Sequence, residues 1–172
     1  MRVILFFFFA WMAVATAGAQ TIPSAEAVLK PVYAKAGVEG KNILLIFHAS
    51  WCGWCRKMDA SLQDPAIKPA IDRNYEIAHL TVHESANKKA LENPGAIEFL
   101  KKNGGENSGL PFWLVLDKNG NVLANSQRKP AENTGCPASE EEVAYFLQVL
   151  KKTSSMSPDE LEAIRKRFRQ NE

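Results

Sequence analysis

Two cysteines, Cys52 and Cys55, are separated by two residues and lie between an apolar run at residues 43–47 and a helix-like stretch at residues 56–62. Unpaired backbone N–H groups at a helix N-terminus stabilise a thiolate and can lower a cysteine pKa from about 8.5 to between about 3.5 and 7.5. This spacing also lets the second sulfur displace the first from a mixed disulfide. The pattern predicts a dithiol/disulfide redox site, with Cys52 as the exposed nucleophile and Cys55 as the more buried resolving thiol.

The residues beside the cysteines suit the docking of a protein substrate. Trp51 and Trp54 would add apolar surface around the nucleophile, and Gly53 would keep the turn unobstructed. Because a dithiol itself carries two electrons, we expect no cofactor.

Other uses of a Cys-x-x-Cys motif fit this sequence less well. Arg56 stands where haem attachment requires histidine. A structural zinc site needs four ligands, and only Cys136 and three histidines remain to complete one. A structural disulfide across so short a loop would gain little entropy. A metal carrier that uses Cys52, Cys55 and Cys136 remains an alternative that metal analysis would test.

The segment F-H-A-S-W-C-G-W-C-R-K-M at residues 47–58 resembles the active-site segment of the thioredoxin superfamily. The resemblance continues through Leu110-Pro111 with its following strand, the Asn119-Gly120 turn and the helix after Ser139, and covers roughly residues 24–152. It implies an α/β fold, the thioredoxin fold, with a mixed central sheet and helices on both faces. It also implies a cis peptide bond before Pro111 and a Leu110 backbone that pairs with an extended substrate.

Among such proteins, the Gly-Trp pair between the cysteines is similar to that of exported bacterial thiol:disulfide oxidoreductases. The resemblance implies cysteine-containing protein substrates and a membrane or soluble redox partner. Two departures from the family pattern matter. Ile46 replaces the buried acid of thioredoxin, so the rate of thioredoxin does not carry over to this chain. Trp54 precedes the second cysteine at a position that tunes the redox potential, so the potential stays open. The absence of a large helical insertion before Pro111 favours a reductant or general exchange role over a dedicated oxidant. A peptide-binding or chaperone module with incidental redox activity is the alternative.

The first 19 residues have the pattern of a secretory signal peptide. Arg2 precedes an apolar core, and Ala17-Gly18-Ala19 forms a small-x-small cleavage site, so we expect a periplasmic or secreted mature chain that begins at Gln20. An uncleaved membrane anchor is the alternative, but the apolar run is shorter than the roughly 20 residues of a membrane span. The formal charge of +2 suggests neither nucleic acid nor an acidic membrane surface as a partner.

About 150 residues remain after the leader, enough for one domain. We expect a thioredoxin-like domain at residues 20–152 and a C-terminal helical extension at residues 153–172. Apolar patterns and capping signals predict helices at residues 24–36, 56–62, 64–73, 93–104 and 139–152 and from residue 157 onward, and strands at residues 43–47, 75–82, 112–116 and 121–124. Residues 84–93 have no clear pattern, and residues 126–138 are expected to form a loop.

Four further side chains could take part in chemistry. Cys136 could resolve a mixed disulfide or bind a partner, but we favour a buried, inert thiol. His48 could shuttle protons, although a histidine packed at a strand end is the simpler expectation. His79 and His83 flank a strand and are expected to be structural.

Overall fold

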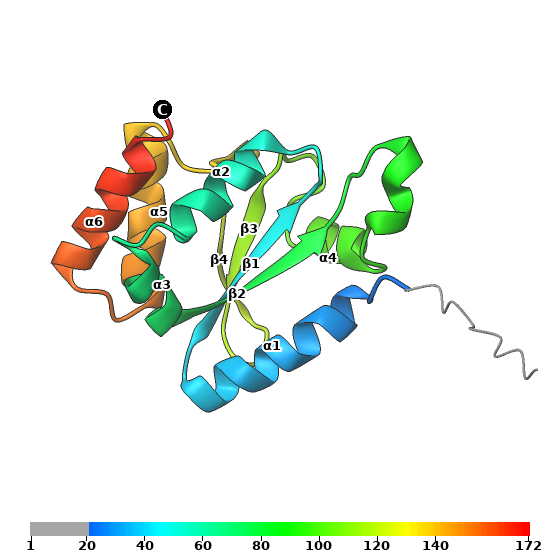
Figure 1. The fold of residues 1–172 in the computed structure, drawn as a ribbon, viewed down its shortest axis with the longest axis horizontal. Helices are drawn as coiled ribbons and strands as arrows, with labels where there is room; N and C mark the ends of the chain where they lie inside the picture. Colours follow the sequence, from blue (N-terminus) through cyan, green and yellow to red (C-terminus); the bar gives the residue numbers. More distant parts are fainter. Residues whose placement is uncertain (1–20) are drawn as a thin grey trace, which may run out of the picture.

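The computed structural model describes residues 21–172 (Figure 1). The predicted signal peptide at residues 1–19 therefore lies outside the described residues. Within residues 21–172, none of the helices combines the length and the apolar character needed to cross a bilayer.

A four-stranded mixed sheet forms the centre of the fold, in the order β2-β1-β3-β4. The strands are β1 (Asn42–His48), β2 (Tyr75–Thr81), β3 (Phe112–Leu116) and β4 (Val122–Asn125). β1 pairs parallel to β2 and antiparallel to β3, and β4 returns antiparallel to β3 after the Asn119-Gly120 turn. Residues 43–47 of β1 and all of β3 are apolar and buried, as is typical of central strands that helices cover on both faces.

Helices lie on both sides of this sheet, as Figure 1 shows. α1 (Ala25–Glu39) and α4 (Ala96–Lys102) pack on the face that carries Leu45 and Leu114. The other face carries α2 (Gly53–Leu62), α3 (Lys68–Asn74), α5 (Glu140–Thr153) and α6 (Pro158–Arg169). The predicted α/β class, mixed sheet and extra C-terminal helix are confirmed.

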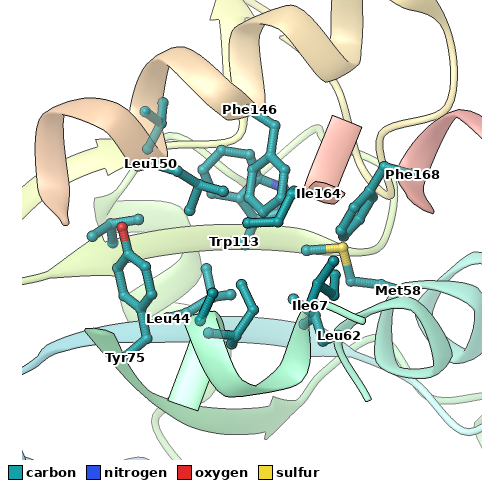
Figure 2. Close-up of a cluster of buried hydrophobic side chains, with 14 of the residues drawn as sticks. Leu44, Met58, Leu62, Ile67, Tyr75, Trp113, Phe146, Leu150, Ile164 and Phe168 are labelled. Carbon is teal, nitrogen blue, oxygen red and sulfur yellow. The ribbon is translucent and has the colours of Figure 1, made fainter. Parts of the chain in front are cut away.

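The C-terminal helix shares a core with the helix that follows the cysteines. In Figure 2, Phe146 of α5 and Phe168 of α6 lie between Trp113 of β3 and Met58 of α2. The ring centroid of Phe146 lies 5.3 Å from that of Trp113 and 5.0 Å from that of Phe168. All four side chains are fully buried, so α6 is part of the hydrophobic core.

Two helices begin as their capping signals predict. The hydroxyls of Ser139 and Ser157 accept hydrogen bonds from the backbone N–H groups of Glu142 and Glu160, and both glutamates complete capping boxes. α5 therefore starts at Glu140, and α6 starts at Pro158.

Four helix boundaries differ from expectation by about three residues. α2 begins at Gly53, before the predicted start at residue 56, because Cys52 is its N-cap. α1 runs past residue 36 to Glu39 and ends where Gly40 adopts a left-handed conformation. α3 begins at Lys68, because the Asp64 carboxylate accepts a hydrogen bond from the Ala66 N–H and forms a turn in place of a helix cap. α4 begins at Ala96, because Gly95 before it has a positive φ of 83°.

Two segments without a clear sequence pattern contain short regular structure. Residues 84–93 include the 3-10 helix η1 (Ala86–Leu91). The expected loop at residues 126–138 contains a small hairpin of β5 (Gln127–Lys129) and β6 (Glu132–Asn133). The first segment contacts Ser50, before Cys52, through Glu84, and the second contacts Gly109 and Pro111 through Asn133.

Candidate active site

A disulfide joins Cys52 and Cys55 at the start of α2. Cys52 is the N-cap residue of this helix, and the Cys55 N–H donates to its Sγ at 3.1 Å. The remaining N–H groups of the first helical turn have no partner within the helix. The sulfur of Cys52 therefore lies at the positive end of the helix dipole, where a thiolate is stabilised.

Burial does not distinguish the two cysteines in this oxidised form. Each is 2% exposed, whereas we expected Cys52 to be the more accessible residue. Ala49 forms a small buried cluster with the two cysteines, and Leu110 packs against this cluster. The position of Cys52 at the N-cap of α2, and not its exposure, distinguishes it from Cys55.

The two tryptophans beside the disulfide are about half exposed. Trp51 Nε1 donates to the carbonyl oxygen of His83 at 2.8 Å, which fixes the indole against the segment after β2. The Lys57 ammonium lies 4.4 Å from the ring centroid of Trp54. Both rings thus present apolar surface next to the cysteines, as substrate docking would require.

The Leu110–Pro111 peptide bond is cis, the isomer that the resemblance implies. Asn133 Nδ2 donates to the carbonyl oxygens of Gly109 at 2.7 Å and of Pro111 at 3.1 Å, so β6 holds the chain on both sides of Leu110. Within residues 21–172, the N–H and C=O of Leu110 have no hydrogen-bond partner. They are free to pair with an extended chain.

A groove of about 650 Å³ runs beside this turn. It reaches from the active-site helix to the start of α5 and is lined by residues that include Trp54, Ser108, Leu110, Thr134, Cys136 and Glu142. The structure therefore brings together the predicted Trp54, Leu110 and the third cysteine.

Cys136 is a free, buried thiol. Burial raises its pKa to about 12, although the positive charges of Lys57 and Arg167 act in the opposite direction. Asn171 Nδ2 lies 3.5 Å from its Sγ and also donates to the hydroxyl of Ser61 on α2. This thiol stays protonated near neutral pH, in agreement with the expectation of an inert cysteine.

The three histidines lie around the end of the β1–β2 pair. His48 is half-buried, and its pKa is lowered, first by burial and then by the nearby His79; Asp59 and Glu84 oppose this shift. His79 Nε2 lies 2.8 Å from Asp59 Oδ1, a partner on α2 that no local sequence pattern indicates. The backbone of His83 has a positive φ of 53° and receives the Trp51 hydrogen bond described above.

Sequence reasoning missed Glu84, which is 4% exposed and contacts the loop before Cys52. Its only sequence signal is a carboxylate directly after a strand in a polar segment, which is typical of a solvated loop. Within the described residues, no group of three or more His, Cys, Asp or Glu side chains is placed to hold a metal ion.

Comparison with known proteins agrees with this geometry. A family model described as thioredoxin-like matches residues 26–118, which include the cysteines, the cis-proline and the first three strands of the sheet. The match ends before α5 and α6, so these helices, and the groove wall that includes Cys136 and Glu142, are outside it.

A relative found by sequence comparison shares about a third of its residues with this chain over the matched region. The rice protein "Protein disulfide isomerase-like 1-2" (Oryza sativa subsp. japonica) is 31% identical over 120 residues, which are 65% of this chain and 23% of that protein. The chain thus spans about a quarter of the length of this relative.

Two solved structures are similar to the chain. A disulphide isomerase from Xylella fastidiosa Temecula1 superposes with a TM-score of 0.50 at 20% identity, over 89% of this chain and 98% of that one. A thioredoxin from Thermus thermophilus gives a TM-score of 0.47 at 17% identity, over 77% and 87% of the two chains. The first likeness extends the shared fold to most of the chain.

Proposed function

The chain belongs to the thioredoxin-like family, and on that basis we propose that it is a protein thiol:disulfide oxidoreductase that uses the Cys52–Cys55 pair. The observation that carries the proposal is the placement of Cys52 at the N-cap of α2 with Cys55 in bonding contact. Trp51, Gly53, Trp54 and the Leu110–Pro111 turn form the substrate surface in this proposal. No cofactor is required, since the sulfurs themselves carry the two electrons.

The reaction runs in two exchanges. The Cys52 thiolate attacks one sulfur of a substrate disulfide, forms a mixed disulfide, and releases the other substrate sulfur, which takes up a proton. The Cys55 thiolate then attacks Cys52 Sγ, closes the Cys52–Cys55 bond and releases the second substrate thiol. Two electrons pass from the protein to the substrate, and the same steps in reverse oxidise a substrate dithiol.

Insulin reduction with dithiothreitol as electron source tests the proposal. We expect the wild type to accelerate it, Cys52→Ser to be inactive and Cys55→Ser to accumulate a mixed disulfide with the substrate. Cys136→Ser is the matched control, because it removes a thiol outside the pair, and it should keep at least half of the activity. An inactive wild type, or an active Cys52→Ser variant, would contradict the proposal. A wild type without dithiol exchange, together with a Cys52→Ser variant that keeps full activity in a chaperone assay, would favour the binding-module alternative.

We propose a reductant or general exchange role over that of a dedicated oxidant. The connection between α2 and the cis-proline holds only α3, β2, η1 and α4, without a separate helical domain. Equilibration of the Cys52–Cys55 couple with glutathione measures its potential. A value near −270 mV supports the reductant role, whereas one near −120 mV is typical of strong oxidants and would overturn it.

Export is a further part of the proposal and is supported by the leader pattern at residues 1–19. Expression of the full chain in a Gram-negative host, followed by fractionation and N-terminal sequencing, tests it. We expect periplasmic protein that begins at Gln20. Protein that retains Met1 in the cytosolic fraction would contradict export, and the same protein in the membrane fraction would support the uncleaved anchor.

A further inference from the structure

Ser50, two residues before the nucleophile, has all of its polar groups held by charged side chains. Its N–H donates to Glu84 Oε1 at 2.5 Å, and its hydroxyl donates to Glu84 Oε2 at 2.8 Å. Its carbonyl oxygen accepts a hydrogen bond from Arg56 Nη1 of α2 at 3.1 Å. Hydrogen bonds to ionised groups are stronger than neutral ones, so Ser50 is fixed from two sides.

The carboxylate that holds Ser50 is itself held by the segment around η1. The Glu84 N–H donates to Glu92 Oε1 at 2.7 Å, and Lys89 forms an ion pair with the same Glu92 carboxylate. The hydrogen bonds that Glu84 accepts from Ser50, together with the nearby charge of Lys88, outweigh the effect of burial and lower the Glu84 pKa. Glu84 is therefore ionised at neutral pH, buried and bidentate on one residue.

The loop that Ser50 belongs to determines where Cys52 lies. The Cys52 N–H donates to the Ala49 carbonyl oxygen at 3.0 Å across this turn, and the adjacent Trp51 is bound to His83, the residue before Glu84. A change in the turn would shift Cys52 Sγ relative to the N–H groups of α2, on which its acidity depends.

We propose that Glu84 is a positioning residue for Cys52: through Ser50 it holds the turn that keeps the nucleophilic sulfur at the N-cap of α2. The inference rests on the proposed function, because it concerns the reactivity of the same thiol. A nearby negative charge by itself disfavours a thiolate and would raise the Cys52 pKa, whereas correct positioning of the sulfur would lower it. The two possible effects of Glu84 on the Cys52 pKa therefore have opposite signs. Loss of Glu84 makes Cys52 more acidic if charge dominates, and less acidic if position dominates.

The test measures alkylation of Cys52 in a Cys55→Ser, Cys136→Ser background, in which Cys52 is the single thiol of the sequence. The rate constant with iodoacetamide between pH 4 and 9 gives both the thiolate pKa and its intrinsic reactivity. We expect Glu84→Ala to raise the pKa and to slow alkylation at pH 6 about tenfold, which corresponds to one pKa unit. Glu84→Gln keeps one acceptor for Ser50 and should slow it less.

Glu98→Gln is the matched control, because it removes an exposed carboxylate on α4 and should leave the rate within about twofold of the parent. If Glu84→Ala does not fold, Glu84→Gln and Ser50→Ala replace it, and both should slow alkylation by more than the control does. Equal or faster alkylation in the folded Glu84 variants would overturn the inference. Because alkylation requires no substrate protein, this result is independent of whether insulin is reduced.

Discussion

At the scale of single residues, one side-chain type serves two purposes in this protein. Cys52 lies at a helix N-terminus and in bonding contact with Cys55, whereas Cys136 is surrounded by core side chains and the Asn171 amide. The first environment stabilises an anion, and the second disfavours one. The thiols should therefore differ in reactivity although all three are buried.

Thiol counting tests this difference. In reduced native protein at pH 8, iodoacetamide should modify Cys52 within minutes and leave Cys136 unmodified, since a Cys136 pKa of about 12 leaves almost no thiolate. In urea the count should rise to three. Mass spectrometry identifies the protected residue, and rapid native labelling of Cys136 would contradict its assignment as inert.

His48 should make stability depend on pH in acid. Its pKa in the folded protein is lowered by burial and by His79, despite the opposing carboxylates of Asp59 and Glu84. Below its ordinary value of 6.5 the unfolded chain therefore binds the proton more readily, and the stability contributed by neutral His48 is lost as the pH falls from there toward the folded pKa.

Thermal unfolding of wild type and His48→Gln at pH 7.5, 6.5 and 5 checks this sign. The Tm of the wild type should fall more than that of the variant between pH 6.5 and 5, and the two should run parallel above pH 7. A steeper acid loss in His48→Gln would show that the protonated form is the stabilised one.

At the scale of elements, the sequence predicts a strand, turn or helix start correctly where several neighbouring residues indicate the same structure. The apolar run of β1, the Asn119-Gly120 turn and the capping boxes of α5 and α6 each depend on residues within a few positions of one another. The starts of α3 and α4 were placed too early, because turn hydrogen bonding at Asp64 and a positive φ at Gly95 outweighed the proline signals.

The contacts of the site could be predicted only in part, because sequence patterns report on residues that are close together in the chain. The cysteines are neighbours in sequence, but Glu84 meets Ser50 across 34 positions and His79 meets Asp59 across 20. Both pairings depend on the parallel register of β1 and β2, which brings the end of β2 beside the loop before α2. No pattern within a short window contains that information.

The α5 capping box should contribute measurably to stability. Ser139→Ala removes the acceptor for the Glu142 N–H and should lower the free energy of unfolding by about 1 kcal/mol. Ser85→Ala is the matched control, since Ser85 precedes η1 without capping it, and should change stability by a few tenths of a kcal/mol. Urea denaturation measures both, and equal effects would contradict the assigned cap.

At the scale of the whole molecule, the two faces of the sheet differ in which helices pack on them. One face packs α1 and α4, whereas the other joins the active-site helix to α5 and α6 in a single cluster. Lys57 and Ser61 of α2 also bond to Asn171 beyond the end of α6. The C-terminal helices therefore support the helix that carries the cysteines, although the family match ends at residue 118.

Truncation of Phe168 tests this support. Phe168→Ala should lower the free energy of unfolding by about 3 kcal/mol or more, because it leaves a cavity against Phe146 in a fully buried cluster. Val38→Ala on α1 is the control, since Val38 is exposed and its loss should matter little. Unfolding of α6 alone in a separate early transition would contradict a shared core.

The tryptophans beside the disulfide have a practical consequence. Within residues 21–172 the indoles are those of Trp51, which precedes Cys52, of Trp54, which lies between the two cysteines in sequence, and of Trp113 in the core. A disulfide accepts an electron from an excited indole and quenches its fluorescence, whereas a pair of thiols does so far less. The emission of the protein should therefore brighten when the pair is reduced, which would allow its oxidation state to be followed in real time without a dye.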